Sequence, residues 1–362
     1  MTERLVPRAL SDVIDSEPRI LIEAELRPSQ GQRFQPTGFP DLGAATFESP
    51  EGRTNLLVES PQSMANRLEL VSWDEARGDL VEVLQGLPYV KVRVVSPSGE
   101  IIGETSSILE AHRLNSPYIL HDEASDFKQT LSGLAGIQAR QAGTGKGKKG
   151  APDGKGSSPI GPLDRRKLAA AAFRFDPGSV LHGVFLEKLD GRARLTRVLS
   201  GFIEAEDVRT AVSGGVKNDR IDPSGFTEAG YGNVPFTRVE YVAKRITAYF
   251  NLDLALLRSY GLPQAASDLL VALGLWKIGR FLEEGLRLRT ACDLTVTKVY
   301  VTRPEGMALP APEELEPQLR RLIRACQPYF ASPPVTELTV RYERKRGGKE
   351  DATGDTNGDG SA

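Results

Sequence analysis

The sequence predicts an α+β fold, in which strands and helices are mixed and long segments are inserted between them. Short stretches that alternate apolar and charged residues, such as ILIEAEL at residues 20–26, are typical of half-buried strands. Helical segments separate these stretches, and no glycine-rich strand-to-helix turn marks a dinucleotide-binding unit. The order strand, helix, hairpin, helix, strand is compatible with a ferredoxin-like core that carries large insertions.

The first elements follow from local patterns. After the strand at residues 20–26, the segment NLLVESPQSMANRLELV at residues 55–71 predicts a strand that enters a short helix. Ser60 is a suitable N-cap, and Pro61 suits the first helical position, where its missing N–H costs no hydrogen bond. Residues 89–95 (YVKVRVV) alternate again and lead through an SPSG turn into a further strand, which predicts a hairpin.

Later elements are predicted in the same way. The apolar segment 269–286 predicts a buried helix, and residues 313–325 predict an amphipathic helix. Strands are expected within residues 180–205, 237–250, 294–301 and 335–341.

We expect a single domain over residues 1–343 with two inserted segments. Residues 141–161 are rich in Gly, Lys, Pro and Ser and predict a flexible basic loop. Residues 213–236 are too polar and glycine-rich for a core and too long for a simple turn, so they should protrude. A disordered polar tail is expected at residues 344–362.

The composition is that of an ordinary globular protein, with 40% hydrophobic and 26% charged residues among 362. A formal net charge of −2 excludes a globally basic nucleic-acid binder but leaves room for a local basic groove. Cys292 and Cys326 lack metal-ligand spacing, which favours a reducing cytoplasm over a disulfide framework or a zinc site. The N-terminus has no apolar core of a signal peptide, and no apolar stretch is long enough to cross a bilayer.

A catalytic role finds little support. His112, His121 and His182 form no HxH, HExxH or HD pair, and no GxSxG elbow occurs. The run AGTGKGKK at residues 142–149 lacks the first glycine and the final Ser or Thr of a phosphate-binding loop, so a flexible basic loop explains it better. We therefore predict that the chain is not an enzyme and needs neither a cofactor nor a metal.

Some charged residues have two interpretations. Asp41 lies in a Gly/Pro loop (TGFPDLG), where a turn-forming Asp is the ordinary explanation. The EAED segment could hold a divalent ion, although a solvated helix face is the simpler interpretation; its carboxylates are Glu204, Glu206 and Asp207. The basic loop carries lysines that are able to contact phosphate, namely Lys146, Lys148, Lys149 and Lys155.

A nucleic-acid site is better supported, at the start of the helix that follows Ser60. A helix N-terminus presents free N–H groups and a partial positive charge, which suit phosphate. Gln62 and Ser63 supply such amides, and the side chains of Asn66 and Arg67 follow one turn later. The alternative is a solvated helix face with a routine cap.

Other cations extend this hypothesis. Arg33 and Arg53 lie nearby in the sequence and add positive charge. Lys91 and Arg93 share one face of the strand at residues 89–95, which we expect to lie adjacent to the helix. Single-stranded RNA commonly lies along such a strand face.

The same segments resemble a known family. RPSQGQRFQPTGFPDLG at residues 27–43 and LLVESPQSMANRLE at residues 56–69 resemble the Csb-one family of CRISPR-associated RAMP proteins. This family is the Cas-seven-type backbone of the type I-G (formerly I-U) interference complex. The likeness continues in one order at residues 203–225, 231–254 and 272–294.

The resemblance implies an RRM-like palm with inserted elements, whose copies polymerise along a CRISPR RNA beside other subunits of the complex. Such subunits hold the RNA backbone without reading its sequence and leave the bases free to pair with target DNA. Segment 213–236 would be the thumb that contacts a neighbouring copy. The implied RNA contacts are Ser60, Gln62, Ser63, Asn66 and Arg67 at the helix start and Lys217 and Arg220 on the thumb.

Two rival functions stay open at this point. The similar backbone subunit of type III complexes cleaves target RNA with a loop Asp after the first strand, and Asp41 lies in a comparable stretch. Its PTGFPDLG setting nevertheless resembles the non-cleaving family. A free-standing metabolic enzyme would need a pocket with convergent polar groups, to which nothing in the sequence points.

Overall fold

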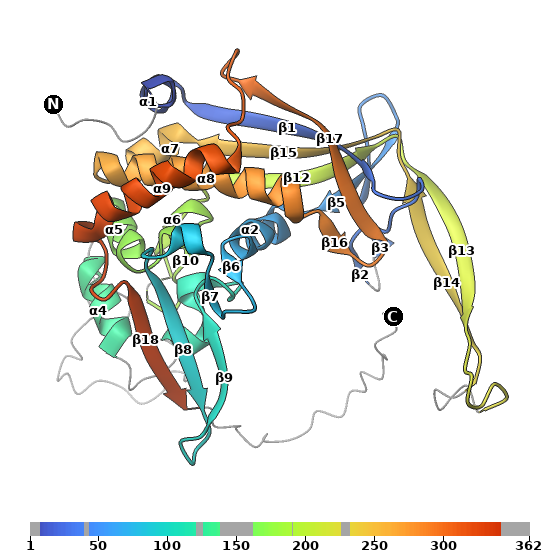
Figure 1. The fold of residues 1–362 in the computed structure, drawn as a ribbon, viewed down its shortest axis with the longest axis horizontal. Coiled ribbons are helices and arrows are strands. Elements are labelled where there is room, and N and C mark those ends of the chain that lie inside the picture. The colour runs from blue at the N-terminus through green and yellow to red at the C-terminus, as the bar shows by residue number, and fades with distance from the viewer. Residues whose placement is uncertain are drawn as a thin grey trace, which may run out of the picture.

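A seven-stranded antiparallel sheet crosses the molecule, with helices gathered on one of its faces (Figure 1). The computed structural model describes residues 8–39, 43–120, 126–137, 162–189, 191–225 and 232–341. In spatial order the strands are β16 (Arg287–Arg289), β17 (Cys292–Arg303), β1 (Arg19–Pro28), β15 (Arg245–Asp253), β12 (Leu199–Glu206), β5 (Thr54–Glu59) and β4 (Thr46–Glu48). The predicted α+β class is confirmed.

The period-2 pattern of β1 fixes which face of the sheet is covered. Ile20, Ile22 and Ala24 are buried, whereas the residues between them are only half-buried. In the antiparallel pair with β15, Ile22 lies opposite Phe250, which is also buried. A slip by one residue would expose this whole apolar row, so the pattern also fixes the register.

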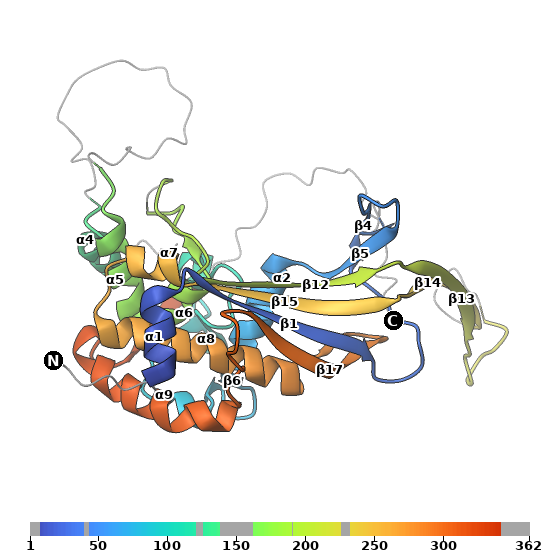
Figure 2. The same ribbon diagram turned by 90° about the horizontal axis from the view of Figure 1, so that it is seen from above.

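The covered face packs on a layer of helices. The longest, α8 (Gln264–Glu284), is buried along most of its length, as its nearly continuous apolar sequence predicts. The amphipathic helix α9 (Pro312–Cys326) packs alongside α8 (Figure 2). Two shorter helices, α2 (Pro61–Leu70) and α6 (Pro177–Leu181), complete the layer, and α2 packs against β12.

A second, three-stranded sheet lies beyond the helices (Figure 1). Its central strand β8 (Tyr89–Val95) pairs antiparallel with β9 (Ile101–Ser106) and parallel with β18 (Val335–Arg341). The β8–β9 hairpin is therefore present as expected. This sheet is separate from the main one, so β8 is not paired with β5, the strand that leads into α2.

A long hairpin of β13 (Arg209–Lys217) and β14 (Val234–Val242) projects from one end of the main sheet (Figures 1 and 2). The segment expected to protrude, residues 213–236, supplies the ends of these two strands, residues 213–217 and 234–236, and the described residues between them are not strand. Apolar side chains are exposed along the hairpin, among them Val212, Ile221 and Phe236.

The other elements connect these layers. They are α1 (Arg8–Ser16), β2 (Gly38–Phe39), β3 (Gly43–Ala44), β6 (Trp73–Asp74), β7 (Asp79–Leu80), η1 (Glu82–Leu84), η2 (Arg113–Asn115), α3 (Pro117–Leu120), α4 (Asp126–Leu134), α5 (Arg165–Phe175), β10 (Val184–Phe185), β11 (Arg194–Leu195), α7 (Leu254–Ser259) and η4 (Gln327–Tyr329). The strand region expected from residue 180 begins later, because residues 180 and 181 belong to α6 and the first strand after it is β10. No helix in the described ranges is long and apolar enough to cross a membrane. The expected basic loop, the polar tail, His121 and Asp41 lie outside the described residues.

Candidate nucleic-acid interface

The start of α2 has the geometry that its sequence predicts. Ser60 is the N-cap in extended conformation, and its side chain accepts a hydrogen bond from the Ser63 N–H at 3.3 Å. Pro61 is the first helical residue. Met64 and Leu68 are buried beneath the sheet, which turns the opposite side of the first turn outward. The helix start is thus fixed in place, with the Ser63 N–H bonded to its cap and Gln62 exposed to solvent.

Loss of this cap should destabilise the helix measurably. We expect Ser60→Ala to lower the free energy of unfolding by about 1 kcal/mol, because one N–H of the first turn loses its acceptor. Ser60→Asn, which retains a capping oxygen, should stay close to the parent chain in urea unfolding. Equal stability of the alanine variant and the parent would contradict this role of Ser60.

A buried carboxylate lies below the helix start. Glu59, the last residue of β5, is completely buried and receives the guanidinium of Arg67 at 2.8 Å. It also accepts a short hydrogen bond from the Ser63 hydroxyl and another from Arg289 of β16. One carboxylate therefore holds two cations, and the cluster retains a net positive charge.

Both guanidiniums have further anchors in the backbone. Arg67 donates to the Leu288 carbonyl at 2.5 Å, and Arg289 donates to the Val58 carbonyl at 3.2 Å. Their side chains are 23% and 22% exposed, so each guanidinium is both fixed and open to solvent. Rigid guanidiniums lose little entropy when they bind an oxyanion such as phosphate.

Strands β5 and β16 meet at this cluster although they stand near opposite ends of the strand order. The main sheet must therefore curl until its two edges approach each other. This curl brings Arg289 to the helix start, and Arg289 and Glu59 are the site residues that the sequence reasoning missed. Arg289 has no local signal, because its contact with Glu59 joins residues far apart in the chain.

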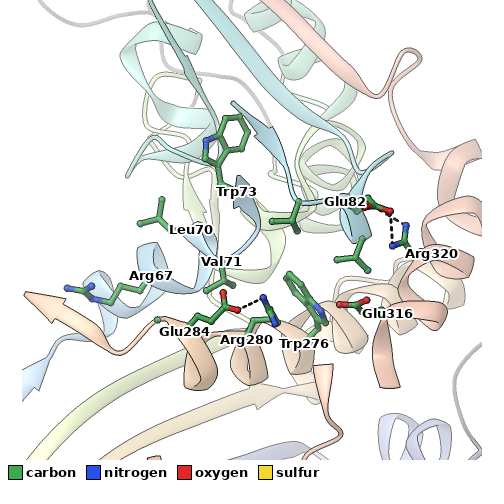
Figure 3. A pocket seen from close by; sticks show the side chains of 13 residues that line it. Arg67, Leu70, Val71, Trp73, Glu82, Trp276, Arg280, Glu284, Glu316 and Arg320 are labelled. Atoms are coloured by element: carbon green, nitrogen blue, oxygen red, sulfur yellow. Dashed lines mark hydrogen bonds and ion pairs between the residues drawn. The ribbon is translucent and has the colours of Figure 1, made fainter. Parts of the chain in front are cut away.

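A groove of about 510 Å³ begins at Arg67 and continues along α8 and α9 (Figure 3). Its apolar lining includes Val71, Trp73 and Trp276. Its cations are balanced by carboxylates, as in the Arg280–Glu284 and Arg320–Glu82 pairs at 2.7 and 3.5 Å. The groove thus has no excess positive charge of its own.

A second buried charge cluster holds the far end of α2. Glu69 contacts His182 at 3.0 Å and Lys277 of α8 at 3.2 Å, with Arg113 at 3.9 Å. All four are almost completely buried. Asp176 lies beside them and accepts a hydrogen bond from Ser179 at 2.8 Å.

Burial and neighbouring charge shift the pKa values of Glu69, His182 and Asp176 in this cluster. Burial acts to raise the pKa of Glu69, but Lys277, His182 and Arg113 together outweigh it and lower that pKa. Burial lowers the pKa of His182 to about 4, which favours a neutral ring at pH 7. Burial and the charge of Glu69 raise the pKa of Asp176 to about 6. The cluster therefore adds buried charge contacts to the apolar packing of α2, α6 and α8.

The structure keeps the predicted helix-start residues together but changes the role of one. Gln62 is exposed and Asn66 is half-buried, as a binding face requires. Arg67 is not a free surface cation, because Glu59 and the Leu288 carbonyl hold it.

The expectation that Lys91 and Arg93 lie on a strand adjacent to α2 is wrong. Both are on β8 of the second sheet, because alternation along a strand does not reveal which sheet the strand joins. Lys91 pairs with Glu104 at 3.0 Å, and Arg93 pairs with Glu337 at 2.9 Å. Their charges are therefore largely neutralised.

The remaining predicted cations are scattered. Arg33 pairs with Glu240 of β14 at 3.0 Å, near the base of the long hairpin. Arg53 is exposed in the turn between β4 and β5. Lys217 ends β13 and Arg220 follows it shortly, and both side chains are exposed. The structure thus does not bring these four residues to the helix start.

The EAED segment is not a helix face. Glu204 and Glu206 belong to strand β12, and Asp207 follows in the turn to β13. Within the described part of the chain, no three His, Cys, Asp or Glu side chains are close enough to hold a metal ion together.

The sequence of the chain matches the model of a known protein family. The model of CRISPR-associated protein GSU0053 matches residues 20–210, more than half of the 362-residue chain. The chain belongs to this CRISPR-associated family. The match to the GSU0053 family includes all of α2 and the carboxylates Glu59 and Glu69, but it ends before Lys217, Arg220 and Arg289.

Other comparisons of this GSU0053-family chain are more distant. A chain of a CRISPR RNA-guided surveillance complex, pre-nicking, is 15% identical with a TM-score of 0.40, over 85% of this chain and 89% of that one. Csc2 of Thermofilum pendens is 11% identical with a TM-score of 0.28, over 85% and 76%. Both TM-scores lie below 0.5, and we draw no conclusion from either likeness. No significant match was found among curated proteins.

Proposed function

We propose that this chain is the RNA-holding backbone subunit of a type I CRISPR interference complex, of the I-G subtype that its sequence resembles. Copies of it would line up along a CRISPR RNA in the cytoplasm, beside the other subunits of the complex. Each copy would hold the RNA backbone without cutting it and leave the bases to pair with target DNA. Membership of a CRISPR-associated family supports this proposal.

The observation that carries the proposal is the cation pair beside the start of α2. Arg67 and Arg289 share one buried carboxylate, so one positive charge remains to attract phosphate. Guanidinium groups and helix N–H groups bind phosphate oxygens and do not read bases. A backbone subunit needs this sequence-independent kind of grip.

The proposed palm is RRM-like. Four central strands support this fold. In the chain they follow one another as β1, β12, β15 and β17, and in the sheet they are ordered β17-β1-β15-β12. Helices lie between β1 and β12 and between β15 and β17 in the chain, as in a β-α-β-β-α-β unit. The β13–β14 hairpin, inserted between β12 and β15, would be the thumb, with Lys217 and Arg220 as further RNA contacts.

A charge swap at Gln62 tests the proposal because it separates RNA binding from stability. We expect Gln62→Glu to weaken the binding of guide-length RNA roughly tenfold, the equivalent of about 1.4 kcal/mol, since a carboxylate repels phosphate. The same change should leave the helix intact, because a negative charge suits the first turn. Gln62→Lys should strengthen RNA binding without raising the stability of the protein, because a positive charge does not suit the first turn of a helix.

The two effects are measured by fluorescence anisotropy of labelled RNA at low salt and by thermal unfolding. RNA affinities that are the same for the glutamate and lysine variants would argue against phosphate at this helix start.

A further inference from the structure

The face of the main sheet opposite the helices is open. In Figures 1 and 2, no helix of the described chain lies over the middle of β1, β12, β15 and β17 on this side. Half-buried residues of β1 point to this face, since those between them are buried in the core.

One row of side chains across this face is aromatic. Glu23 of β1 lies opposite Tyr300 of β17 on one side and opposite Tyr249 of β15 on the other. Tyr249 in turn lies opposite Phe202 of β12, and their rings stack with centroids 5.0 Å apart and an interplanar angle of 25°. Cross-strand neighbours of this kind form one continuous surface.

The next row is acidic. Glu25 of β1 and Glu204 of β12 both lie opposite Thr247 of β15. These two rows form what we call the sheet patch: Glu23, Glu25, Phe202, Glu204, Tyr249 and Tyr300.

The carboxylates of the sheet patch are poorly neutralised. The Tyr300 hydroxyl donates to Glu25 at 3.1 Å, and Lys298 lies 4.3 Å from the centre of the Tyr300 ring. Glu23 and Glu204 make no hydrogen bond or ion pair in the described part of the chain, and the nearby cation Arg245 is held by Glu206 at 2.5 Å. The patch therefore carries a net negative charge around a half-buried aromatic centre.

This chemistry decides which partners fit. RNA is disfavoured, because its phosphates would meet unpaired carboxylates even though the aromatic rings could stack on bases. Two copies of the sheet patch cannot face each other, because carboxylate would meet carboxylate. Arginine fits best, since its guanidinium binds a carboxylate and also stacks on an aromatic ring.

We propose that the sheet patch docks an arginine-bearing surface of a different protein subunit, with guanidinium groups on Glu23 and Glu204 and apolar stems over Phe202 and Tyr249. This inference rests on the proposed function only in requiring that the chain work within an assembly. It assigns the RNA and the partner protein to opposite faces of the main sheet.

The test uses the complex as it assembles when the chain is produced with its neighbouring genes. Phe202 is replaced by the photoreactive analogue p-benzoylphenylalanine, the complex is irradiated, and crosslinked peptides are identified by mass spectrometry. We expect crosslinks to an arginine-containing peptide of another subunit. The yield should fall roughly tenfold in Glu23→Lys/Glu204→Lys and stay unchanged in the control Glu100→Lys, whose side chain is exposed in the turn between β8 and β9.

Crosslinks to RNA, to a second copy of this chain or to no partner would overturn the proposal, as would a yield that the lysines do not change. If the double lysine variant unfolds in a thermal scan, Glu23→Gln/Glu204→Gln replaces it with the same expected direction. The analogue placed at Gln62 reports separately on the proposed function. Crosslinking of RNA at position 62 with no protein crosslinked at position 202 would contradict the docking proposal and leave the proposed function standing.

Discussion

Glu69→Ala is expected to lower the free energy of unfolding by about 3–5 kcal/mol, more than any other single change considered for this chain. The substitution leaves Lys277 and Arg113 buried without a carboxylate, next to His182. Urea unfolding at pH 7 measures the loss. Because folding lowers the pKa of Glu69, its contribution is present in full above its ordinary value of 4.5 and declines as the pH falls further. The difference in the free energy of unfolding between parent and variant should therefore become smaller at acidic pH.

Glu284→Ala is the matched control for this prediction. Glu284 also pairs with a cation of α8, Arg280 at 2.7 Å, but its side chain is 67% exposed. Solvent-exposed pairs of this type contribute only about 0.3–0.5 kcal/mol. Similar losses in the two variants would mean that the cluster around Glu69 is not the buried anchor of α2.

The second large effect concerns RNA affinity at the Arg67–Arg289 pair. Replacing both arginines alone would leave Glu59 buried and uncompensated, which would confuse binding with folding. The triple variant Glu59→Gln/Arg67→Gln/Arg289→Gln removes the carboxylate together with its cations. We expect it to bind guide-length RNA on the order of a hundredfold more weakly, equally for all RNA sequences, because two phosphate contacts are lost.

Glu59→Gln alone is the reference, since it differs from the triple variant only in keeping the two arginines. It should bind RNA at least as tightly as the parent chain, because the arginines then lack their counter-charge. Salt titration adds an independent readout: loss of two contacts should reduce the slope of log affinity against log salt by about 1.4. The same affinity and slope in both variants would place the RNA elsewhere.

Local patterns predicted the elements that position the site. The alternation in β1 and the Ser60–Pro61 start of α2 are signals carried by neighbouring residues, and the structure contains both. Such signals arise because period-2 burial and helix capping act over a few residues. The α+β class and the hairpin of β8 and β9 followed from the same kind of evidence.

Contacts between distant segments could not be predicted in this way. Arg289 reaches Glu59 only because the main sheet curls, and no pattern within β5 or β16 reports that curl. Lys91 was assigned to the wrong neighbourhood because alternation gives the face of a residue but not its sheet. Lys277, a buried charge in the mostly apolar sequence of α8, belongs to a cluster that forms only when α2 and α8 pack together.

The central claim is that this chain holds guide RNA in an assembly of several copies. The most direct measurement is to produce it with its neighbouring genes, purify it at moderate salt, and analyse the bound nucleic acid by absorbance ratio and small-RNA sequencing. The account predicts RNA of CRISPR-guide length in a complex that contains several copies of the chain. A monomer free of nucleic acid in that preparation would contradict it.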